Sequence, residues 1–367
     1  MTATPFTASF TDSDNAHMAA ALGLAARGLG RVAPNPAVGC VLVQGSHVVG
    51  RGWTQPGGRP HAETEALGRA GGAARGATAF VTLEPCSHHG QTPPCADALI
   101  EAGVVRVIAA IEDPDHRVAG QGLARLRAAG ITVETGLMAD RARALNLGFI
   151  LNRTSGRPFV TLKLATTLDG KIATATGASQ WITGPMARAE GQHLRATHDA
   201  VAVGIGTALA DNPKLTVRLP GQDQDQPLRV VFDSQGRLPA TSALARDGAA
   251  DSLVLTGPDG PAAIGAAQVQ RVDLGADGRI DPAAALACLA ARGITRVMVE
   301  GGGQLAASLL RAGLVDQIAW FRAGAVMGAD GLPGLGPLGI GDLDDMPRFT
   351  VQARRMLGGD VLELWVR

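Results

Sequence analysis

The feature that most constrains this chain is a set of three potential zinc ligands with a carboxylate beside the first of them. His61 is followed two residues later by Glu63, and two Pro-Cys pairs further along supply Cys86 and Cys95. A structural zinc site is usually closed by four protein ligands, whereas three ligands leave a position for water, whose pKa zinc lowers to about 7. In zinc deaminases an H-x-E motif precedes P-C-x-x-C, and its Glu moves protons without binding the metal. We therefore predict one zinc ion per chain, hydrolytic deamination, and Glu63 as the proton carrier.

The spacing of the two cysteines departs from that signature. Eight residues, rather than two, separate Cys86 from Cys95. A helix is predicted over residues 95–102, and its N-terminus would favour the Cys95 thiolate. The inserted loop carries His88 and His89, which could contact substrate, compete for the metal or be solvated loop residues.

Composition argues against several classes of protein. Lys and Arg together number 33, as do Asp and Glu, and no basic run is present, which disfavours a nucleic-acid groove. No apolar run approaches the roughly 20 residues of a membrane span, and the N-terminus lacks the pattern of a signal peptide. Four cysteines are too few for a disulfide scaffold, and Cys40 and Cys288 are expected to be small buried hydrophobes. We expect a cytoplasmic protein with no nucleic-acid or membrane partner.

The pattern of apolar segments predicts two α/β domains, as the length of 367 residues also suggests. Strands alternating with helices indicate layered α/β structure, with site residues at strand ends and helix starts. The predicted organisation is a mobile arm over residues 1–13, a zinc deaminase domain over 14–148, a linker over 149–157 and a second α/β domain over 158–367. In the first domain strands are predicted over residues 38–43, 48–50, 79–83, 105–110 and 131–133, and helices over 14–27, 61–70, 95–102 and 122–129. In the second domain strands are predicted over 158–164, 200–204, 228–233, 252–255 and 296–300, helices over 185–196, 282–292 and 304–312, and loops over 220–227 and 324–341.

Several long motifs resemble one known family. The run EPCSHHGQTPPC ending at Cys95, with residues 34–40 and 61–63 upstream, is similar to the bifunctional deaminase/reductase of riboflavin biosynthesis. Downstream, residues 163–170, 179–183, 206–213 and 299–303 resemble the same family, and the similarity runs from about residue 14 to the end. The resemblance implies a cytidine-deaminase-like α/β/α sandwich followed by a dihydrofolate-reductase-like α/β domain.

The resemblance also implies the two reactions. The first is zinc-dependent deamination of 2,5-diamino-6-(5-phosphoribosylamino)pyrimidin-4-one. The second is NADPH-dependent reduction of the ribosyl arm to ribityl, which gives 5-amino-6-(5-phosphoribitylamino)uracil. A homo-oligomer formed through the reductase domain is a further implication.

The run of three glycines at residues 301–303 is the second candidate site. It is predicted to lie between a strand and a helix, where backbone N–H groups can bind a phosphate, although a tight turn would explain it equally well. It is not the G-x-G-x-x-G fingerprint of dinucleotide-binding folds. The resemblance implies that it holds the pyrophosphate of NADPH. The cofactor-binding residues implied in the same way are Ala165, Trp181, Thr207, Asp211, Ser234, Gly301, Gly302, Gly303, Gln304 and Leu305.

Substrate-binding and proton-donating residues follow from the same resemblance. The implied substrate-binding residues are Asn35, Ser179, Arg195, Leu215, Arg218 and Glu300, and the candidates for proton delivery in the reductase are Lys163, Asp211 and Glu300. Taken alone, the arginines could be surface residues, Trp181 could belong to the core, and Asn35 could simply form a turn. The loop at residues 112–116 is expected to face the ribose phosphate, but Asp115 and His116 stand where the family more often has Asn-Pro.

Two other interpretations remain open at this point. A nucleoside or tRNA deaminase with an unrelated second domain would be expected to have Cys-x-x-Cys and, for tRNA, a basic surface. A zinc-stabilised binding module without catalytic activity would need a fourth ligand, which His88 or His89 could supply, and would leave Glu63 unexplained.

Overall fold

The chain divides into two units between Ser155 and Gly156. The computed structural model describes residues 10–88, 93–115, 119–221, 226–246 and 248–367. Most of the predicted N-terminal arm lies outside these residues, and helix α1 (Asp12–Ala25) begins within the predicted arm, capped by Thr11. Helix α5 (Ala139–Ser155) also runs on through residues 149–155, which the sequence analysis assigned to a linker. Their polar composition suggested a linker, but Phe149 is buried in the core of the first unit and keeps this part of the helix attached to it.

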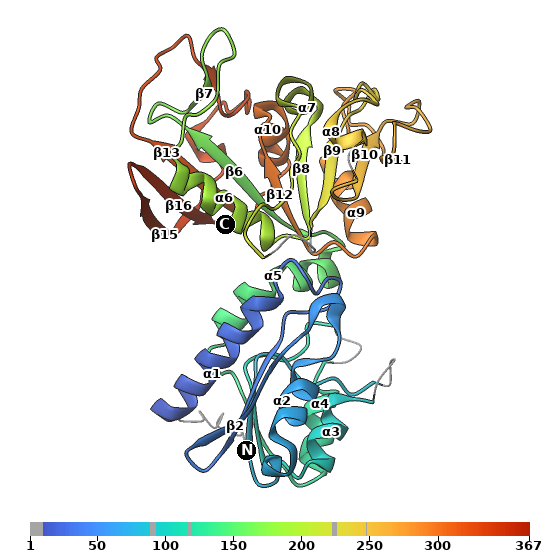
Figure 1. Ribbon diagram of the computed structural model, residues 1–367, viewed down its shortest axis with the longest axis vertical. Helices are drawn as coiled ribbons and strands as arrows, with labels where there is room; N and C mark the ends of the chain where they lie inside the picture. Colours follow the sequence, from blue (N-terminus) through green and yellow to red (C-terminus); the bar gives the residue numbers. More distant parts are fainter. Residues whose placement is uncertain (1–9, 89–92, 116–118, 222–225, 247) are drawn as a thin grey trace. The chain divides into compact units, whose positions relative to one another are not determined.

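The first unit is a three-layer α/β/α sandwich. Its five-stranded sheet has the order β2-β1-β3-β4-β5, in which β3, β4 and β5 are parallel and β1 is antiparallel to both β2 and β3. The strands are β1 (Gly39–Gln44), β2 (His47–Trp53), β3 (Thr78–Val81), β4 (Arg106–Ala109) and β5 (Thr132–Thr135). Helices α1 and α5 cover one face, while α2 (Ala62–Ala70), α3 (Cys95–Glu101) and α4 (Gln121–Ala128) cover the other (Figure 1). The predicted elements of this unit are confirmed, with small shifts of their ends.

A glycine in β2 brings the start of α2 against the sheet. A Cβ atom on Gly52 would lie 2.1 Å from the backbone oxygen of Ala62, so any side chain there would push the helix away. This close approach places the N-terminus of α2, which carries His61 and Glu63, directly over the sheet.

The second unit contains a nine-stranded mixed sheet in the order β11-β10-β9-β8-β12-β6-β13-β16-β15. Strands β11, β10, β9, β8, β12, β6 and β13 are parallel to their neighbours, whereas β16 and β15 continue the sheet antiparallel. The strands are β6 (Phe159–Thr166), β8 (Ala200–Gly204), β9 (Leu228–Phe232), β10 (Ser252–Thr256), β11 (Gln268–Arg271), β12 (Arg296–Glu300), β13 (Gln317–Ala323), β15 (Thr350–Leu357) and β16 (Asp360–Val366). Strands β7 (Lys171–Ala173) and β14 (Leu332–Pro333) form a separate pair, so the predicted loop over residues 324–341 contains a short strand.

Helices pack on both faces of this sheet. Apolar residues of α9 (Pro282–Ala291) and α10 (Gly303–Arg311) form one core with the sheet. On the other face, α6 (Pro185–Ala196), α7 (Ile205–Asp211) and α8 (Ala243–Arg246) contribute to separate apolar clusters. The parallel strands therefore end together at one edge of a covered α/β sheet, which is where such folds usually bind ligands (Figure 1).

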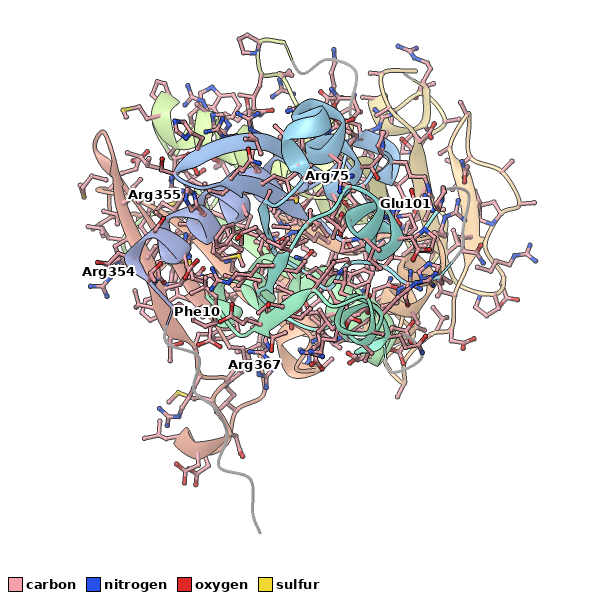
Figure 2. All side chains as sticks on the ribbon, turned by 90° about the horizontal axis from the view of Figure 1, so that it is seen from below. Phe10, Arg75, Glu101, Arg354, Arg355 and Arg367 are labelled. Atoms are coloured by element: carbon pink, nitrogen blue, oxygen red, sulfur yellow. The ribbon has the colours of Figure 1, made fainter. Side chains whose placement is uncertain are left out.

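Charged side chains mark the outer strand β15. Arg354 and Arg355 project from this strand, and their side chains are largely exposed (Figure 2). Charges on an edge strand discourage further strand pairing with other molecules.

Two expectations from composition can be compared with the structure. Cys40 is fully buried, as predicted, whereas Cys288 is only half-buried on α9, because its side chain lies toward the margin of the helix's apolar face.

Among the described helices, none has the length and apolar character that crossing a bilayer requires.

Candidate active sites

The three predicted metal ligands meet at the end of strand β3. His61 is the N-cap residue of α2, Cys86 follows β3, and Cys95 is the first residue of α3. One ligand atom from each lies within 4.8 Å of the others, with His61 Nδ1 3.3 Å from Cys95 Sγ and 3.7 Å from Cys86 Sγ. One imidazole nitrogen and two sulfur atoms are donors that zinc prefers, and three protein ligands correspond to an open site. The chemistry of this donor set therefore fits zinc.

The two cysteines differ in acidity. The hydrogen bond from Cys95 lowers the pKa of the Cys86 thiol to about 4, against the opposing effect of burial, and His61 lowers it further. The same hydrogen bond, together with burial, raises the pKa of the Cys95 thiol above its ordinary value. The pair thus holds one proton between the two sulfur atoms. Because zinc binds thiolates, metal binding would release that proton.

Glu63 lies beside the three ligands but is not one of them. Its side chain is only 3% exposed, and it is absent from the group of converging ligand atoms in the described part of the chain. Burial raises the pKa of the Glu63 carboxyl to about 7, and the negative charge of Cys86 acts in the same direction. A carboxyl group with a pKa near the working pH can both accept and donate a proton.

A cavity of about 340 Å³ opens over this group. Asn35 lines it together with His61, Glu63 and Cys86, and so does the exposed His88, whereas His89 and His116 lie outside the described residues. The Asn35 amide packs directly on Gly58, where an added Cβ would lie 1.8 Å from Asn35 Nδ2. The Asn35 backbone N–H also closes a turn with Val32 at 2.9 Å, so the residue both forms a turn and faces the cavity.

Several residues that line this cavity were not predicted from the sequence, among them Arg59, Glu84, Phe149 and Arg153. Glu84 precedes the Pro85-Cys86 pair, so its place in the motif was a signal that could have identified it. Its buried carboxylate accepts hydrogen bonds from the backbone N–H groups of Asp113, Gly120 and Gly122 at 3.0, 2.9 and 2.8 Å. It ties the loop after β4 to the metal-binding segment.

The Glu84 carboxylate is therefore expected to stabilise the first unit. In Glu84→Gln, one carboxylate oxygen becomes an NH₂ group that faces backbone donors, so at least one charge-assisted hydrogen bond is lost. The free energy of unfolding should fall by about 1.5–3 kcal/mol, measured by urea denaturation. Glu101→Gln on α3 is the matched control, because Glu101 is exposed at the surface and its replacement should leave stability unchanged. Equal stability of the two variants would contradict the role of Glu84.

The loop expected to face the ribose phosphate brings carboxylates to the cavity instead. Asp113 and Asp115 both line it, and burial raises the pKa of the Asp113 carboxyl. A phosphate would be repelled by these groups in their charged form. The described arginines of the cavity wall are Arg59 and Arg153, so positive charge comes from other segments.

A second cavity, of about 1320 Å³, lies within the second unit. Its walls come from the carboxyl ends of β6, β8, β9 and β12 and from the starts of α7 and α10. All the residues that the sequence analysis assigned to the second site line it, namely Lys163, Ala165, Ser179, Trp181, Arg195, Thr207, Asp211, Leu215, Arg218, Ser234, Glu300, Gly301, Gly302, Gly303, Gln304 and Leu305. These residues are thus gathered around one space, although they are spread over more than a hundred positions of the sequence.

A charged cluster forms one wall of this cavity. Glu300 Oε1 accepts from Arg195 Nε at 2.5 Å and Oε2 from Arg195 Nη2 at 3.0 Å, while Lys163 Nζ is 3.7 Å from Oε2. Burial alone would raise the pKa of Glu300, but the charges of Arg195 and Lys163 lower it to about 2. Glu300 is therefore ionised at neutral pH and holds no proton to deliver.

The glycine run adopts a conformation that needs glycine. Gly301 and Gly302 have φ angles of 73° and 85°, in the left-handed region, and Gly302 is the N-cap residue of α10. A larger residue at Gly302 would strain the backbone whether or not a ligand is bound. The run is therefore both a tight turn and a wall of the cavity, with backbone N–H groups at the start of α10.

Other predicted residues of the second site have distinct environments. Trp181 is 68% exposed, with the Arg188 guanidinium carbon 4.7 Å from its ring centre, so the alternative that Trp181 is a core residue is wrong. Leu215, by contrast, is buried and has a φ angle of 52°. Arg218 and Asp211 are exposed at the cavity wall.

Comparison with known proteins identifies relatives of both units. Residues 11–111 match the family model of the cytidine and deoxycytidylate deaminase zinc-binding region, and residues 158–356 match that of the RibD C-terminal domain. The riboflavin biosynthesis protein RibD of Escherichia coli is 43% identical over 363 residues, which cover 95% of this chain and 98% of that protein. The protein of the same name from Bacillus amyloliquefaciens is 40% identical over 94% of each chain.

Solved structures give the same result. Acinetobacter baumannii RibD, form 1, superposes with a TM-score of 0.87 at 37% identity, covering 96% of this chain and 98% of its own. A diaminohydroxyphosphoribosylaminopyrimidine deaminase/5-amino-6-(5-phosphoribosylamino)uracil reductase from Thermotoga maritima has a TM-score of 0.86 at 35% identity, with the same coverage.

Proposed function

The chain belongs to the RibD family of bifunctional riboflavin-biosynthesis enzymes, and on this premise we propose which of its residues carry each reaction. It is a hydrolase, through its deaminase domain, and an oxidoreductase, through its reductase domain. The alternative of a nucleoside or tRNA deaminase with an unrelated second domain is wrong, because residues 158–356 match the RibD C-terminal domain. The alternative of a non-catalytic zinc module is wrong because residues 11–111 match the deaminase zinc-binding region and the RibD relatives cover nearly the whole chain.

We assign the deamination of the diaminopyrimidine substrate to the first cavity. His61, Cys86 and Cys95 would hold a zinc ion, which would supply Lewis acidity that lowers the pKa of water toward neutral pH. Glu63 accepts the proton of the attacking water and returns it to the amino group that leaves as ammonia. Asn35 binds the pyrimidine edge, since its amide offers both a donor and an acceptor. The single observation that carries this proposal is the buried Glu63 beside three converging zinc ligands in one cavity.

The phosphate of the substrate's ribosyl arm needs a cationic partner in the same cavity. Arg59 and Arg153 are assigned this role, because an arginine guanidinium forms paired hydrogen bonds with phosphate oxygens. Asp113 and Asp115 are assigned to the hydroxyl or amino groups of the substrate, which can donate hydrogen bonds to a carboxylate.

The second cavity is assigned the reduction. Of its described lining residues, seven are Lys or Arg and three are Asp or Glu, a balance that suits a dinucleotide and a phosphorylated substrate. NADPH supplies the hydride when bound. The backbone at residues 301–305 would hold its pyrophosphate at the start of α10, with Ala165, Trp181, Thr207 and Asp211 along the rest of the cofactor.

The polar wall of this cavity is assigned to the substrate. Ser179, Arg195, Leu215, Arg218 and Glu300 would position it, and Lys163 would donate the proton to the oxygen of the ribosyl carbonyl as the hydride reaches its carbon. The Arg195–Glu300 pair keeps both side chains in one orientation.

We further assign the deaminase to the first unit and the reductase to the second, with the boundary at Ser155. A cytoplasmic location without a nucleic-acid or membrane partner is supported by the balanced charge and by the sequence. Homo-oligomerisation through the reductase unit rests on the family resemblance.

One assay tests the two-site function. The zinc-loaded protein is supplied with the phosphoribosylamino-pyrimidine, and ammonia release and NADPH oxidation are followed together. We expect ammonia with or without NADPH, and NADPH oxidation in proportion to the ammonia already released. Cytidine and tRNA serve as control substrates and should release none. NADPH oxidation without ammonia release would contradict the assigned order.

A further inference from the structure

We propose that Asn146 of α5 is a positioning residue for deamination, which holds the backbone of Ala37 so that the Asn35 amide faces the first cavity. The inference rests on the proposed function, because it requires Asn35 to bind the pyrimidine there. Asn35 lines that cavity, whereas Asn146 is not among its described lining residues and acts only through the segment that carries Asn35.

The prolines on either side of Asn35 limit how this segment can be anchored. Pro34 and Pro36 have no backbone N–H group, so neither can donate a hydrogen bond. The next N–H group after that of Asn35 therefore belongs to Ala37, which is buried. Because the pairing of β1 with β2 begins only at Gly39, Ala37 lies before the paired part of the strand and needs another partner for its backbone groups.

Asn146 supplies that partner from α5, 109 positions later in the sequence. Its Oδ1 accepts from the Ala37 backbone N–H at 2.9 Å, and its Nδ2 donates to the Ala37 backbone oxygen at 3.0 Å. The asparagine amide thus satisfies both backbone groups of one residue, as a neighbouring β-strand would. Asn146 is only 3% exposed, so the pairing is shielded from water and both hydrogen bonds are costly to leave unmade.

The face of α5 that carries Asn146 also forms part of the cavity wall. Phe149 and Arg153 follow Asn146 by three and seven residues, a spacing that places all three side chains on one side of a helix. Both of them line the cavity, and the Arg153 guanidinium carbon is 5.4 Å from the Phe149 ring centre. One helix therefore provides a wall of the cavity and the anchor of the segment that carries Asn35.

The residues next to this anchor leave the segment little freedom. The Val38 backbone N–H donates to Thr54 Oγ1 at 3.0 Å, and the Thr54 backbone N–H donates to the Val38 oxygen at 2.9 Å. Without Asn146, the backbone of Ala37 must turn to find other partners, and Asn35 is only two residues away. Because the amide has to offer a donor and an acceptor to the pyrimidine at hydrogen-bonding distance, a displacement of about 1 Å is enough to weaken binding.

Steady-state kinetics of ammonia release provide the test, with the zinc-loaded full-length protein and the phosphoribosylamino-pyrimidine as substrate. We expect Asn146→Ala to raise KM about tenfold and to leave kcat within about threefold of wild type, because substrate binding is weakened while the metal ligands and Glu63 stay in place. Asn35→Ala should raise KM to a similar extent. The double variant should be no worse than Asn35→Ala alone, because the effects of two residues that act as one unit are not additive.

Asn15→Ala on α1 is the matched control. Asn15 Nδ2 donates to the Thr11 backbone oxygen at 2.9 Å, and Asn15 does not line the cavity among the described residues. Its replacement removes a similar hydrogen bond between an asparagine and the backbone, and KM should stay at the wild-type value. Melting temperature and zinc content show whether each variant is folded and loaded. Asn146→Ser, which keeps a hydroxyl group at the buried position, gives the same measurement if Asn146→Ala does not fold.

Three results would overturn the inference while leaving deamination in place. They are a wild-type KM in a folded Asn146 variant, additive losses in the double variant, and loss of zinc from the Asn146 variants, which would make this residue a support of the metal site. A wild-type KM in Asn35→Ala would overturn the assignment of Asn35 to the pyrimidine and the inference with it. Absence of ammonia release from the wild-type protein would overturn the proposed function itself.

Discussion

Replacement of Glu63 by Gln is expected to slow ammonia release by about 10²- to 10⁴-fold, the usual contribution of a general acid/base group. The amide keeps the volume of the carboxyl but cannot accept the proton of the attacking water. Zinc should remain at one ion per chain, because Glu63 is not among the converging ligands of the described residues. Ammonia release is measured beside zinc content by mass spectrometry.

The neighbouring acidic residue on the same helix is the matched control for Glu63. Glu65 also lies in the first turn of α2, but its carboxylate is 3.0 Å from Arg69 on the outer surface of the unit. Glu65→Gln should deaminate at the wild-type rate. A Glu63→Gln protein with full activity would show that another group carries the proton.

Replacement of Cys86 by Ser should abolish zinc binding and deamination together. Serine offers a hydroxyl that is a poor zinc ligand, and two remaining protein ligands do not make a stable site. The variant also lacks the sulfur that accepts the Cys95 backbone N–H at 3.3 Å, so the start of α3 should become less ordered. Metal content and ammonia release are measured, and NADP⁺ binding should persist because the second cavity is built from other residues.

Cys288→Ser is the matched control for Cys86, since Cys288 is half-buried on α9 and lines neither cavity among the described residues. It should keep zinc and both activities. Retention of zinc and deamination in Cys86→Ser would remove this cysteine from the metal site.

Predictions from sequence succeeded where the physical signal is local. The parallel strands β6, β8, β9, β10 and β12 are short apolar runs because both of their faces are covered, and all of them were predicted. Strands β13, β15 and β16 were missed because they mix charged and apolar residues. In β15, Arg354 and Arg355 are adjacent, and their charges conceal a strand that is exposed along most of its length.

Ionisation and substrate recognition were not predictable in the same way. Glu300 and Arg195 are 105 positions apart, and their contact, together with the charge of Lys163, keeps the Glu300 carboxyl ionised. Glu84 reads as part of a motif, but its role depends on backbone N–H groups from a loop about thirty residues later. Neither the contact between Glu300 and Arg195 nor the hydrogen bonds of Glu84 can be inferred from residue spacing or composition.

The sequence by itself predicted three zinc ligands, whose ligand atoms the structure brings together, and a proton carrier beside them, and it located the glycine turn. Each depends on a few side chains in short motifs, and the chemistry of His, Cys and Glu is the same wherever the chain carries them. Only the tertiary structure decided which charges face each cavity, including Arg59 and Arg153 in the first and Arg237 and Arg279 in the second. Those positions are set by how distant strand ends and loops meet within each unit, because packing around that unit's own sheet, rather than any local pattern, brings them together.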